Sequence, residues 1–426
     1  MRILLLTQYF APEIGATQVR LSAFCRELKA AGHEVEVVTA MPHHPEGRIY
    51  PDYRRYSYRR EILENITVHR VWLYAARGSA FKRILAYVSF AFLCLFGLFR
   101  AKRPDYLFVE SPSLFLAVPG WLASRLWKTP FIFNVADLWP DSVVDLGVMR
   151  LGIATTLGFA LEKWAYRRAD FITTVTEGIR TSLLEKKNVP AKKILFLPNG
   201  VDLSLFQPAT PPDEGLRAQL GLCGKKIVLY AGNHGYANGM EQLIEAAGFV
   251  SDQTVHFLIV GDGPEKPKLQ ALAHQLRLSN IVFLGAVPLE RLPSFLSIAS
   301  IAAVTLRKCS VTQGARSAKI FVMMAAGKPI VLAGQGESAD LVREANAGLI
   351  VSPHSPHHLA EAILLLAKDS ELAAQMGRNG RAFVQARFDW SRLVRNWLAQ
   401  LRRTIPPGDV TPAAPQTENF TAPTAF

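Results

Sequence analysis

The chain has 426 residues, half of them hydrophobic, which is enough for two α/β domains of ordinary size and too much for one small core. Its 48 Lys and Arg outnumber its 35 Asp and Glu, and this excess favours phosphate-bearing partners such as nucleotides or anionic lipid. The basic residues are spread out and are not interleaved with aromatic ones, so we expect no nucleic-acid partner. The four cysteines form no CxxC or Cys/His cluster, which argues against a zinc site or a disulfide framework and favours the cytoplasm.

The first 200 residues alternate between apolar runs and helical or loop segments. An apolar run at 3–6 predicts a first strand, which a loop and a helix over 20–31 follow. The start is therefore interpreted as a strand and not as a secretion signal. Further strands are predicted at 35–38, 106–109, 131–134 and 171–175. Residues 1–200 should form a Rossmann-like domain, a parallel sheet wrapped by helices.

One segment departs from this soluble pattern. Residues 84–99 are almost wholly apolar and are bracketed by basic residues at 82–83 and 100–103. The 16 residues fall short of the roughly 20 that span a bilayer. We expect residues 82–103 to form a helix that lies on the inner membrane, with its basic flanks at the lipid phosphates and the protein peripheral on the cytoplasmic side. A buried core helix is the alternative, because a short apolar run cannot decide between the two.

A second alternation begins after a boundary near residues 195–210. Its strands are predicted at 227–230, 255–260, 281–284, 301–305 and 330–332, and residues 201–380 should form a second Rossmann-like domain. We expect residues 381–404 to be a C-terminal helix that packs back toward the first domain. Residues 405–426, rich in Pro, Thr and Ala, are predicted to be a disordered tail.

Five short motifs occur in order along the two domains: YFAPEIGA at 9–16, DLWP at 137–140, PNGVD at 198–202, VGDGP at 260–264 and AAGKP at 325–329. Together they resemble the retaining glycosyltransferases of family 4, in particular the subgroup of colanic-acid and O-antigen fucosaminyltransferases, over residues 1–402. The resemblance implies the GT-B fold, an α/β architecture of two Rossmann-like domains whose parallel sheets face a central cleft. It implies a hexosyltransferase-like enzyme that moves a sugar from a nucleotide-sugar donor to a lipid-linked glycan acceptor in cell-surface polysaccharide assembly, with no metal or other cofactor. The acceptor domain would come first and the donor domain second.

A transferase without a metal must neutralise the departing diphosphate with backbone N–H groups, helix N-termini and cations. Two strand-to-helix loops offer small residues that let a phosphate approach the backbone. They hold Gly15 and Ala16 in the first domain, and Gly232, Asn233 and Gly235 in the second. A simple tight turn explains Gly15 by itself equally well.

Cations for the same diphosphate are predicted just before the helix-like stretch 320–326. Arg316 and Lys319 could clamp it there, Arg316 as a fork and Lys319 as a point charge, and Lys319 is the preferred phosphate ligand. Ordinary solvated surface residues are the alternative. The pair stands immediately before the AAGKP motif, which favours the functional interpretation.

The chain departs from the family at the ribose site. Relatives place a glutamate about one helical turn after this lysine, where it holds the ribose hydroxyls, and the matching position here is Val322. The earlier glutamate of the family's pair falls at Gly314. Because valine accepts no hydrogen bond, we expect Glu337 or water to substitute; otherwise donor binding is weakened or lost.

The catalytic candidates are Asp137 and His234. Asp137 follows a predicted strand at the edge that should face the cleft, and Trp139 beside it offers a flat wall for a sugar or lipid. The resemblance places Asp137 in the acceptor region, with a supporting or acid-base role, whereas a helix cap would fit its spacing equally well. His234 lies inside the second glycine loop.

Two other functions remain open. A nucleotide-sugar epimerase would share the fold and the diphosphate site. A catalytically silent scaffold for polysaccharide assembly would explain Val322.

Overall fold

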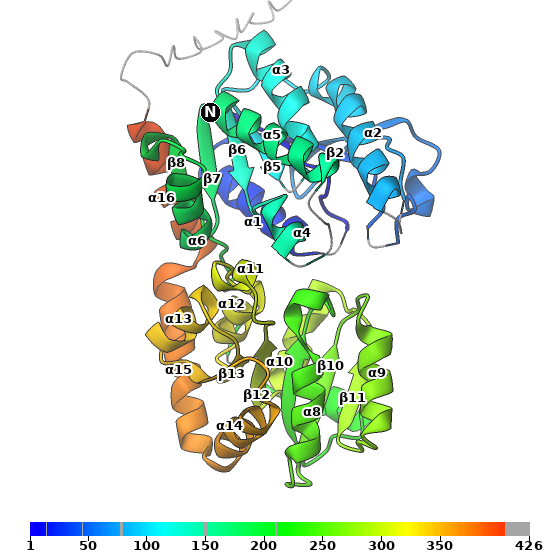
Figure 1. Ribbon diagram of the computed structural model, residues 1–426, viewed down its shortest axis with the longest axis vertical. Helices are drawn as coiled ribbons and strands as arrows, with labels where there is room; N and C mark the ends of the chain where they lie inside the picture. Colours follow the sequence, from blue (N-terminus) through cyan, green and yellow to red (C-terminus); the bar gives the residue numbers. More distant parts are fainter. Residues whose placement is uncertain are drawn as a thin grey trace, which may run out of the picture.

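The computed structural model describes residues 1–13, 15–44, 46–76, 80–111, 113–145, 147, 152–208 and 211–404. Two α/β domains lie end to end, and the chain passes between them near residue 200 and again near residue 388 (Figure 1). The tail predicted for residues 405–426 lies outside the described residues.

The N-terminal domain is built on one eight-stranded sheet in the order β3-β4-β2-β1-β5-β6-β7-β8. Its strands are β1 (Arg2–Leu6), β2 (Glu34–Ala40), β3 (Tyr58–Leu63), β4 (Ile66–Val71), β5 (Tyr106–Ser111), β6 (Phe131–Val135), β7 (Phe171–Thr174) and β8 (Ile194–Phe196). All neighbours pair in parallel except β3 and β4, which form an antiparallel hairpin. The central strands are buried on both faces, so they consist mainly of apolar residues.

Helices cover both faces of this sheet. They are α1 (Ala16–Ala30), η1 (Pro51–Tyr53), α2 (Ala80–Leu98), η2 (Leu114–Leu116), α3 (Ala117–Trp127), α4 (Asp141–Asp145), α5 (Ile153–Arg168), α6 (Glu177–Thr181), η3 (Ser182–Lys186) and η4 (Ala191–Lys193). Residues of α2, α3 and α5 share one hydrophobic cluster, and α1 lies in the cluster on the other face. The apolar segment predicted at 84–99 is therefore the long helix α2.

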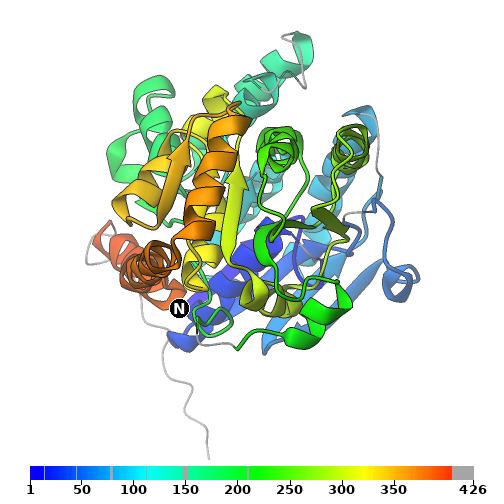
Figure 2. The same cartoon turned by 90° about the horizontal axis from the view of Figure 1, so that it is seen from below.

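The C-terminal domain has a six-stranded, wholly parallel sheet in the order β11-β10-β9-β12-β13-β14. Its strands are β9 (Lys226–Ala231), β10 (Val255–Val260), β11 (Ile281–Leu284), β12 (Ile301–Thr305), β13 (Ile330–Ala333) and β14 (Gly348–Val351). Its helices are α7 (Glu214–Gln219), η5 (Tyr236–Asn238), α8 (Glu241–Phe249), α9 (Lys266–Gln275), η6 (Leu289–Arg291), α10 (Leu292–Ile298), α11 (Ser310–Gln313), α12 (Ala318–Ala325), α13 (Glu337–Glu344), α14 (Pro356–Lys368) and α15 (Ser370–Arg387). Seen from below, these helices flank the sheet on both faces (Figure 2).

The strand order of each sheet reverses at one point. In the first sheet the chain moves outward from β1 through β2 and then returns to β5 on the other side of β1. In the second sheet it moves outward from β9 and returns to β12. Ligands of open parallel sheets bind beyond the carboxyl ends of the strands at such switch points. The loops after β1 and β9, which hold the predicted small residues, both lie at them.

The last helix, α16 (Trp390–Arg403), belongs to the core of the N-terminal domain. Residues 381–404 are thus not one helix: α15 ends at Arg387 within the C-terminal domain, and α16 begins after a break at which Asp389 caps it. Trp397 is fully buried, contacts Phe24 and donates its indole N–H to Thr173 Oγ1 at 3.1 Å. The two domains are therefore connected at both ends of the second one.

We expect Trp397→Ala to lower the free energy of unfolding of the N-terminal domain by about 3–5 kcal/mol, because it leaves a large cavity between α16 and the sheet. Trp397→Phe keeps a ring and loses only the donor to Thr173, so it should cost about 1–2 kcal/mol. The exposed Arg402→Ala on the same helix is the control. Urea unfolding followed by circular dichroism measures all three. Wild-type stability in Trp397→Ala would contradict the role given to α16.

Candidate functional site

Two glycine loops of the C-terminal domain are bonded back to back. The loop after β9 and the loop after β10 share three backbone hydrogen bonds, from Gly232 N to Val260 O (2.9 Å), from His234 N to Asp262 O (2.8 Å) and from Glu265 N to His234 O (3.0 Å). Gly232 has φ 145° and Gly261 has φ 142°. A Cβ at Gly261 would lie 1.9 Å from Gly232 O, so only glycine fits there. The pair forms a fixed backbone floor at the carboxyl edge of the sheet.

Lys319 lies directly against this floor. It is the second residue of α12, its Nζ donates to Asn238 Oδ1 at 2.8 Å, and a Cβ added to Gly232 would come within 2.6 Å of its Cε. Burial lowers the pKa of Lys319 to about 8, and no carboxylate among the described residues pairs with it. A half-buried ammonium without a counter-ion, at a helix N-terminus beside a glycine loop, is suited to a phosphate.

His234 does not have the surroundings of a catalytic group. Its side chain is 0% exposed and lies under Gly261, whose added Cβ would meet His234 Nε2 at 3.0 Å. Burial, with nearby Lys266 adding to it, lowers the pKa of His234 to about 4, so the imidazole is neutral at neutral pH. In this conformation the ring supports the two glycine loops from below, and a fully buried side chain does not fit the catalytic role predicted for it. Asn233 and Gly235 lie in the same loop, and Gly235 precedes η5.

Arg316 and Glu337, both predicted to bind the donor, are joined instead to each other and to the N-terminal domain. Arg316 Nε lies 2.7 Å from Glu337 Oε2. The Glu337 carboxylate also accepts hydrogen bonds from Gly178 N and, at 3.3 Å, from Glu177 N, the first residues of α6. Its charge thus caps a helix of the other domain. In this conformation the Glu337 carboxylate is occupied by the α6 backbone and by Arg316 Nε, so it does not face a ribose. The predicted contact of Arg316 with a phosphate stays a prediction.

The two positions at which relatives carry the paired glutamates have different surroundings. Gly314 lies at the domain interface, where its carbonyl accepts from Thr176 Oγ1 at 2.8 Å and an added Cβ would meet Gly178 Cα at 3.3 Å. Val322 is half-buried and lies three residues after Lys319, on the same side of α12. The ribose position therefore faces the same space as the lysine, but without an acceptor.

In the N-terminal domain, the loop after β1 opens onto the start of α1. Gly15 precedes the helix in extended conformation and Ala16 is its first residue. Sequence reasoning missed Glu13, whose buried carboxylate accepts from His43 N and His44 N, both at 2.8 Å. Glu13 joins the loops after β1 and β2, and its place within the YFAPEIGA motif was the available signal.

Asp137 follows β6 at the same edge. It accepts a hydrogen bond from Ser142 Oγ at 2.9 Å, and burial raises its pKa despite that bond. The neighbouring Asp141 is the first residue of α4, and its carboxylate lies 2.6 Å from Lys187 Nζ. The same Nζ lies 2.8 Å from the Glu162 carboxylate. No cation pairs with Asp137 among the described residues, so nothing there opposes the rise in its pKa through charge.

The edge also contains a buried ion pair that the sequence did not predict. Glu110, at the end of β5, pairs with Arg20 of α1 and accepts from Asn134 Nδ2 of β6 at 2.7 Å. The pair fixes α1 over two strands, and breaking one partner of such a pair is costly.

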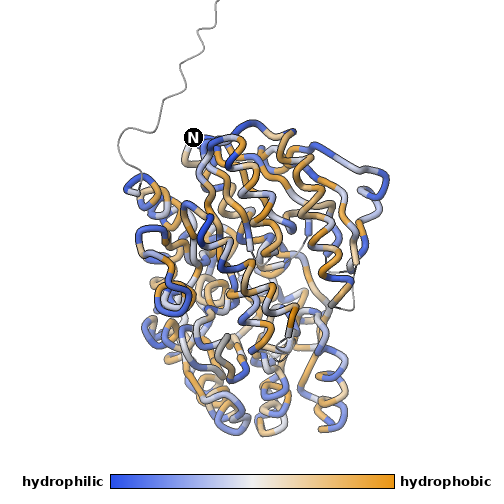
Figure 3. The backbone as a smooth tube through the Cα atoms, turned by 45° about the horizontal axis from the view of Figure 1, so that its top comes forward, coloured by the Kyte–Doolittle hydropathy of each residue, from blue (hydrophilic) through white to orange (hydrophobic). Residues whose placement is uncertain are grey.

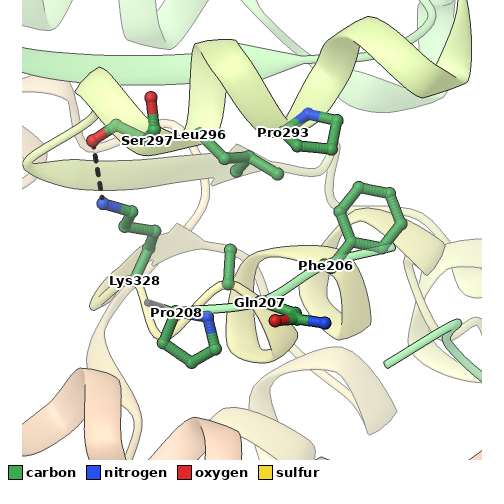
Figure 4. A pocket seen from close by; sticks show the side chains of 8 residues that line it. Phe206, Gln207, Pro208, Pro293, Leu296, Ser297 and Lys328 are labelled. Atoms are coloured by element: carbon green, nitrogen blue, oxygen red, sulfur yellow. Dashed lines mark hydrogen bonds between the residues drawn. The ribbon is translucent and has the colours of Figure 1, made fainter. Parts of the chain in front are cut away.

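A small pocket lies elsewhere, at the amino ends of β12 and β13, and Phe206, Pro208, Leu296 and Lys328 are among its lining residues (Figure 4). Lys328 Nζ donates to Ala299 O at 2.8 Å. Burial lowers the pKa of Lys328 to about 8. Because it lies at the opposite ends of the strands, the pocket is separate from the site described above. Within the described ranges, no three His, Cys, Asp or Glu side chains are grouped to hold a metal ion.

Comparison with known families matches both domains. The family described as "Glycosyl transferase 4-like domain" matches residues 15–200, and "Glycosyl transferases group 1" matches residues 213–383. Among curated proteins, the chain is similar to the colanic acid biosynthesis glycosyl transferase WcaI of Escherichia coli K12, with 28% identity over 94% of this chain and 100% of the relative.

Solved structures share the fold. The sucrose-phosphate synthase of Thermosynechococcus elongatus superposes with a TM-score of 0.73 and 22% identity over 94% of this chain and 98% of its own. HepE of Anabaena, solved in complex with UDP-glucose, gives 0.71 and 19% over 95% of this chain and 100% of its own. The predicted GT-B fold is thereby confirmed.

We expect UDP to bind with an affinity that depends on the charge of Lys319. Above pH 8 the ammonium loses its proton, so affinity should fall by up to about tenfold per pH unit; between about pH 6.5 and 8 both the phosphate and the lysine are charged and affinity should be constant. Lys319→Met should weaken binding at pH 7 by about tenfold or more and abolish the decline above pH 8.

Lys328→Met is the matched control for calorimetry. Burial lowers the pKa of Lys328 to about 8 as well, but Lys328 lies at the opposite edge of the sheet. It should leave UDP affinity unchanged. If the Lys319→Met protein is folded and binds UDP with wild-type affinity, Lys319 is not a phosphate ligand.

Proposed function

Because the chain belongs to the glycosyltransferases, with a glycosyl transferase 4-like domain followed by a group 1 domain, we propose that it transfers a sugar from a nucleotide-sugar donor to a lipid-linked glycan acceptor, with retention at the anomeric carbon. The product would be a cell-surface polysaccharide or its lipid-linked precursor. One observation carries the proposal: the ammonium of Lys319 lies against the Gly232 loop without a carboxylate partner among the described residues. Membership of the glycosyltransferases decides against the epimerase alternative.

The donor's diphosphate would lie between the glycine floor and the N-terminus of α12. Lys319 neutralises the negative charge that grows as the bond from the anomeric carbon to the diphosphate oxygen breaks. The acceptor hydroxyl attacks the same face of the sugar, and its proton passes to the departing diphosphate oxygen. Since a lysine and backbone N–H groups supply this stabilisation, the reaction requires no metal ion.

The acceptor would approach from the N-terminal domain. Asp137, whose pKa burial raises, lies at the edge that faces the donor domain and supports the attacking hydroxyl by hydrogen bonding. Movement about the two crossings near residues 200 and 388 would bring the two substrates together and exclude water.

The silent scaffold is the second candidate, and one observation favours it. Val322 offers no acceptor to the ribose, while Glu337, the expected substitute, is held by Gly178 N and Arg316. For turnover, either Glu337 must leave this contact, or a water molecule must accept the hydrogen bonds of the ribose hydroxyls.

The proposal predicts transfer of radiolabelled sugar from one member of a panel of nucleotide sugars into the lipid fraction of a membrane extract. EDTA should leave the rate unchanged, because no metal takes part. Lys319→Met should lower the rate by tenfold or more, about 1.4 kcal/mol of transition-state stabilisation, and Lys328→Met should not. UDP or GDP binding without transfer from any donor would favour the scaffold, and rescue of EDTA-treated enzyme by a divalent ion would refute the metal-free mechanism.

Association with a membrane is the second part of the proposal. Residues 81–98 of α2 have the length and composition of a membrane span, with a mean hydropathy of 1.7, and 28% of that window is buried. Figure 3 shows hydrophobic residues on helices at the surface of the molecule as well as in its interior. The large apolar side chains exposed on α2 are Phe81, Leu85, Val88, Phe92 and Phe96.

Neighbouring helices also expose large apolar side chains. Val118, Leu122 and Leu126 are exposed on α3, which packs on α2, and Ile153 and Leu157 are exposed on α5, which packs on α3. Exposed apolar side chains on helices that pack together, with basic residues at both ends of α2, suit the anionic surface of a bilayer. The strands on both sides of α2 belong to one sheet, so the helix would lie on the membrane from the cytoplasmic side and not cross it.

Replacing Phe81 and Phe92, both 74% exposed, by Asp should weaken sedimentation with phosphatidylglycerol-containing vesicles by at least tenfold, since each ring contributes about 1.5–3 kcal/mol when buried. UDP affinity should not change. Phe249→Asp, at an exposed ring on the C-terminal domain, is the matched control. A wild-type protein that ignores these vesicles would refute membrane association.

A further inference from the structure

A row of aromatic rings crosses the carboxyl edge of the N-terminal sheet. Tyr87 stacks on Phe115 with ring centroids 6.4 Å apart, and Phe115 lies 6.5 Å from Trp139. At the other end, burial and the neighbouring Tyr87 hydroxyl raise the pKa of Tyr9. All four rings are half-buried, so each presents part of its surface outward. We call Tyr9, Tyr87, Phe115 and Trp139 the aromatic row.

Four different segments supply these rings. Tyr9 comes from the loop after β1, Tyr87 from α2, Phe115 from η2, and Trp139 from the loop after β6. Because loops of different strands converge only at the carboxyl edge, the row lies where substrates of this fold class bind. It begins with Tyr9 beside Tyr87 of α2 and ends at Trp139, two residues from Asp137.

A cation stands at the α2 end of the row. Arg83 precedes Tyr87 by four residues, so the two share one side of the helix, and the Arg83 charge acts on the Tyr9 hydroxyl. No carboxylate in the described part of the chain pairs with Arg83, whose side chain is exposed. The outer face of the same helix is apolar. The three chemistries therefore follow one another: apolar surface, cation and aromatic rings.

We propose that the aromatic row and Arg83 form the acceptor site, which takes a sugar joined through phosphate to a long apolar chain. This inference rests on the proposed transfer to a lipid-linked acceptor and names the residues that select it. The chain remains in the bilayer beside α2, the phosphate pairs with Arg83, and the sugar packs on Phe115 and Trp139 with a hydroxyl toward Asp137.

The combination of these groups determines which class of acceptor the site can bind. An aromatic ring offers a flat apolar face with limited conformational freedom, which suits the apolar face of a pyranose, while a guanidinium pairs phosphate through a fork of N–H groups. A free saccharide would use only the rings, and a simple anionic lipid would use only Arg83 and α2. The complete row is explained by a molecule that carries all three parts.

A synthetic glucosyl farnesyl diphosphate, which carries all three parts, tests the assignment by calorimetry in detergent. Farnesyl diphosphate lacks the sugar, and glucose 1-phosphate lacks the chain. We expect the wild type to bind the complete probe at least tenfold more tightly than either truncated one. Arg83→Gln should weaken the complete probe and farnesyl diphosphate alike, by about tenfold.

Trp139→Leu should weaken only the complete probe, about fivefold to tenfold, because farnesyl diphosphate has no sugar to stack. Trp139→Phe should restore most of that loss. Arg100→Gln is the matched control, since it removes the same charge from the other end of α2, about 25 Å along the helix. All variants should bind UDP as the wild type does, which verifies their fold and donor site.

Equal effects of Trp139→Leu on the complete probe and farnesyl diphosphate would overturn the sugar assignment. Loss of phosphatidylglycerol vesicle binding in Arg83→Gln with unchanged probe affinity would assign Arg83 to the bilayer and overturn the phosphate assignment. The proposed function fails separately, if the wild type binds the probe with the expected selectivity but transfers no sugar to any acceptor.

Discussion

Strands covered by helices on both faces are mainly apolar, and this constraint organises the entire molecule. Polar side chains inside them need a buried partner, as Glu110 has in Arg20, so the lysine and the glycine loops of the predicted site lie at the carboxyl edges of the two sheets. The domain contacts lie there too: Thr176 follows β7, Gly314 follows β12, and Glu337 follows β13. The loops predicted to bind substrate and the loops that join the domains are therefore the same few loops.

Because the same loops are involved, Glu337 is bound at the domain contact in this structure. Its carboxylate can cap α6 or accept bonds from a ligand, but the same lone pairs cannot do both. A donor that draws Glu337 away would release Arg316 at the same time, since the two are paired. The contact that holds the domains together would then be exchanged for contacts with the donor, and binding would be linked to domain movement.

Apolar strands were predictable because periodicity and length reveal them, and the runs at 255–260, 281–284 and 301–305 agree with the strands formed. The hairpin of β3 and β4 was missed, since β3 mixes charged and half-buried residues and its turn uses Glu64 and Asn65 at positive φ. The site was partly predictable. Lys319 could be found from its place at the start of a helix, whereas the roles of Glu13 and Glu337 depend on partners that lie 30 and about 160 residues away.

The position of α16 has a consequence for synthesis on the ribosome. The N-terminal domain's core includes Trp397 and Leu401, so the domain cannot be completed when its own 200 residues have emerged. At roughly 5–20 residues per second, the face of the sheet that α16 covers waits on the order of 10–40 seconds for its last helix. During that time Phe24 and Phe108 lack their partner Trp397. A premature stop within the codons of α16, residues 390–403, would therefore damage the first domain to be made, and a chaperone would find its binding surface there.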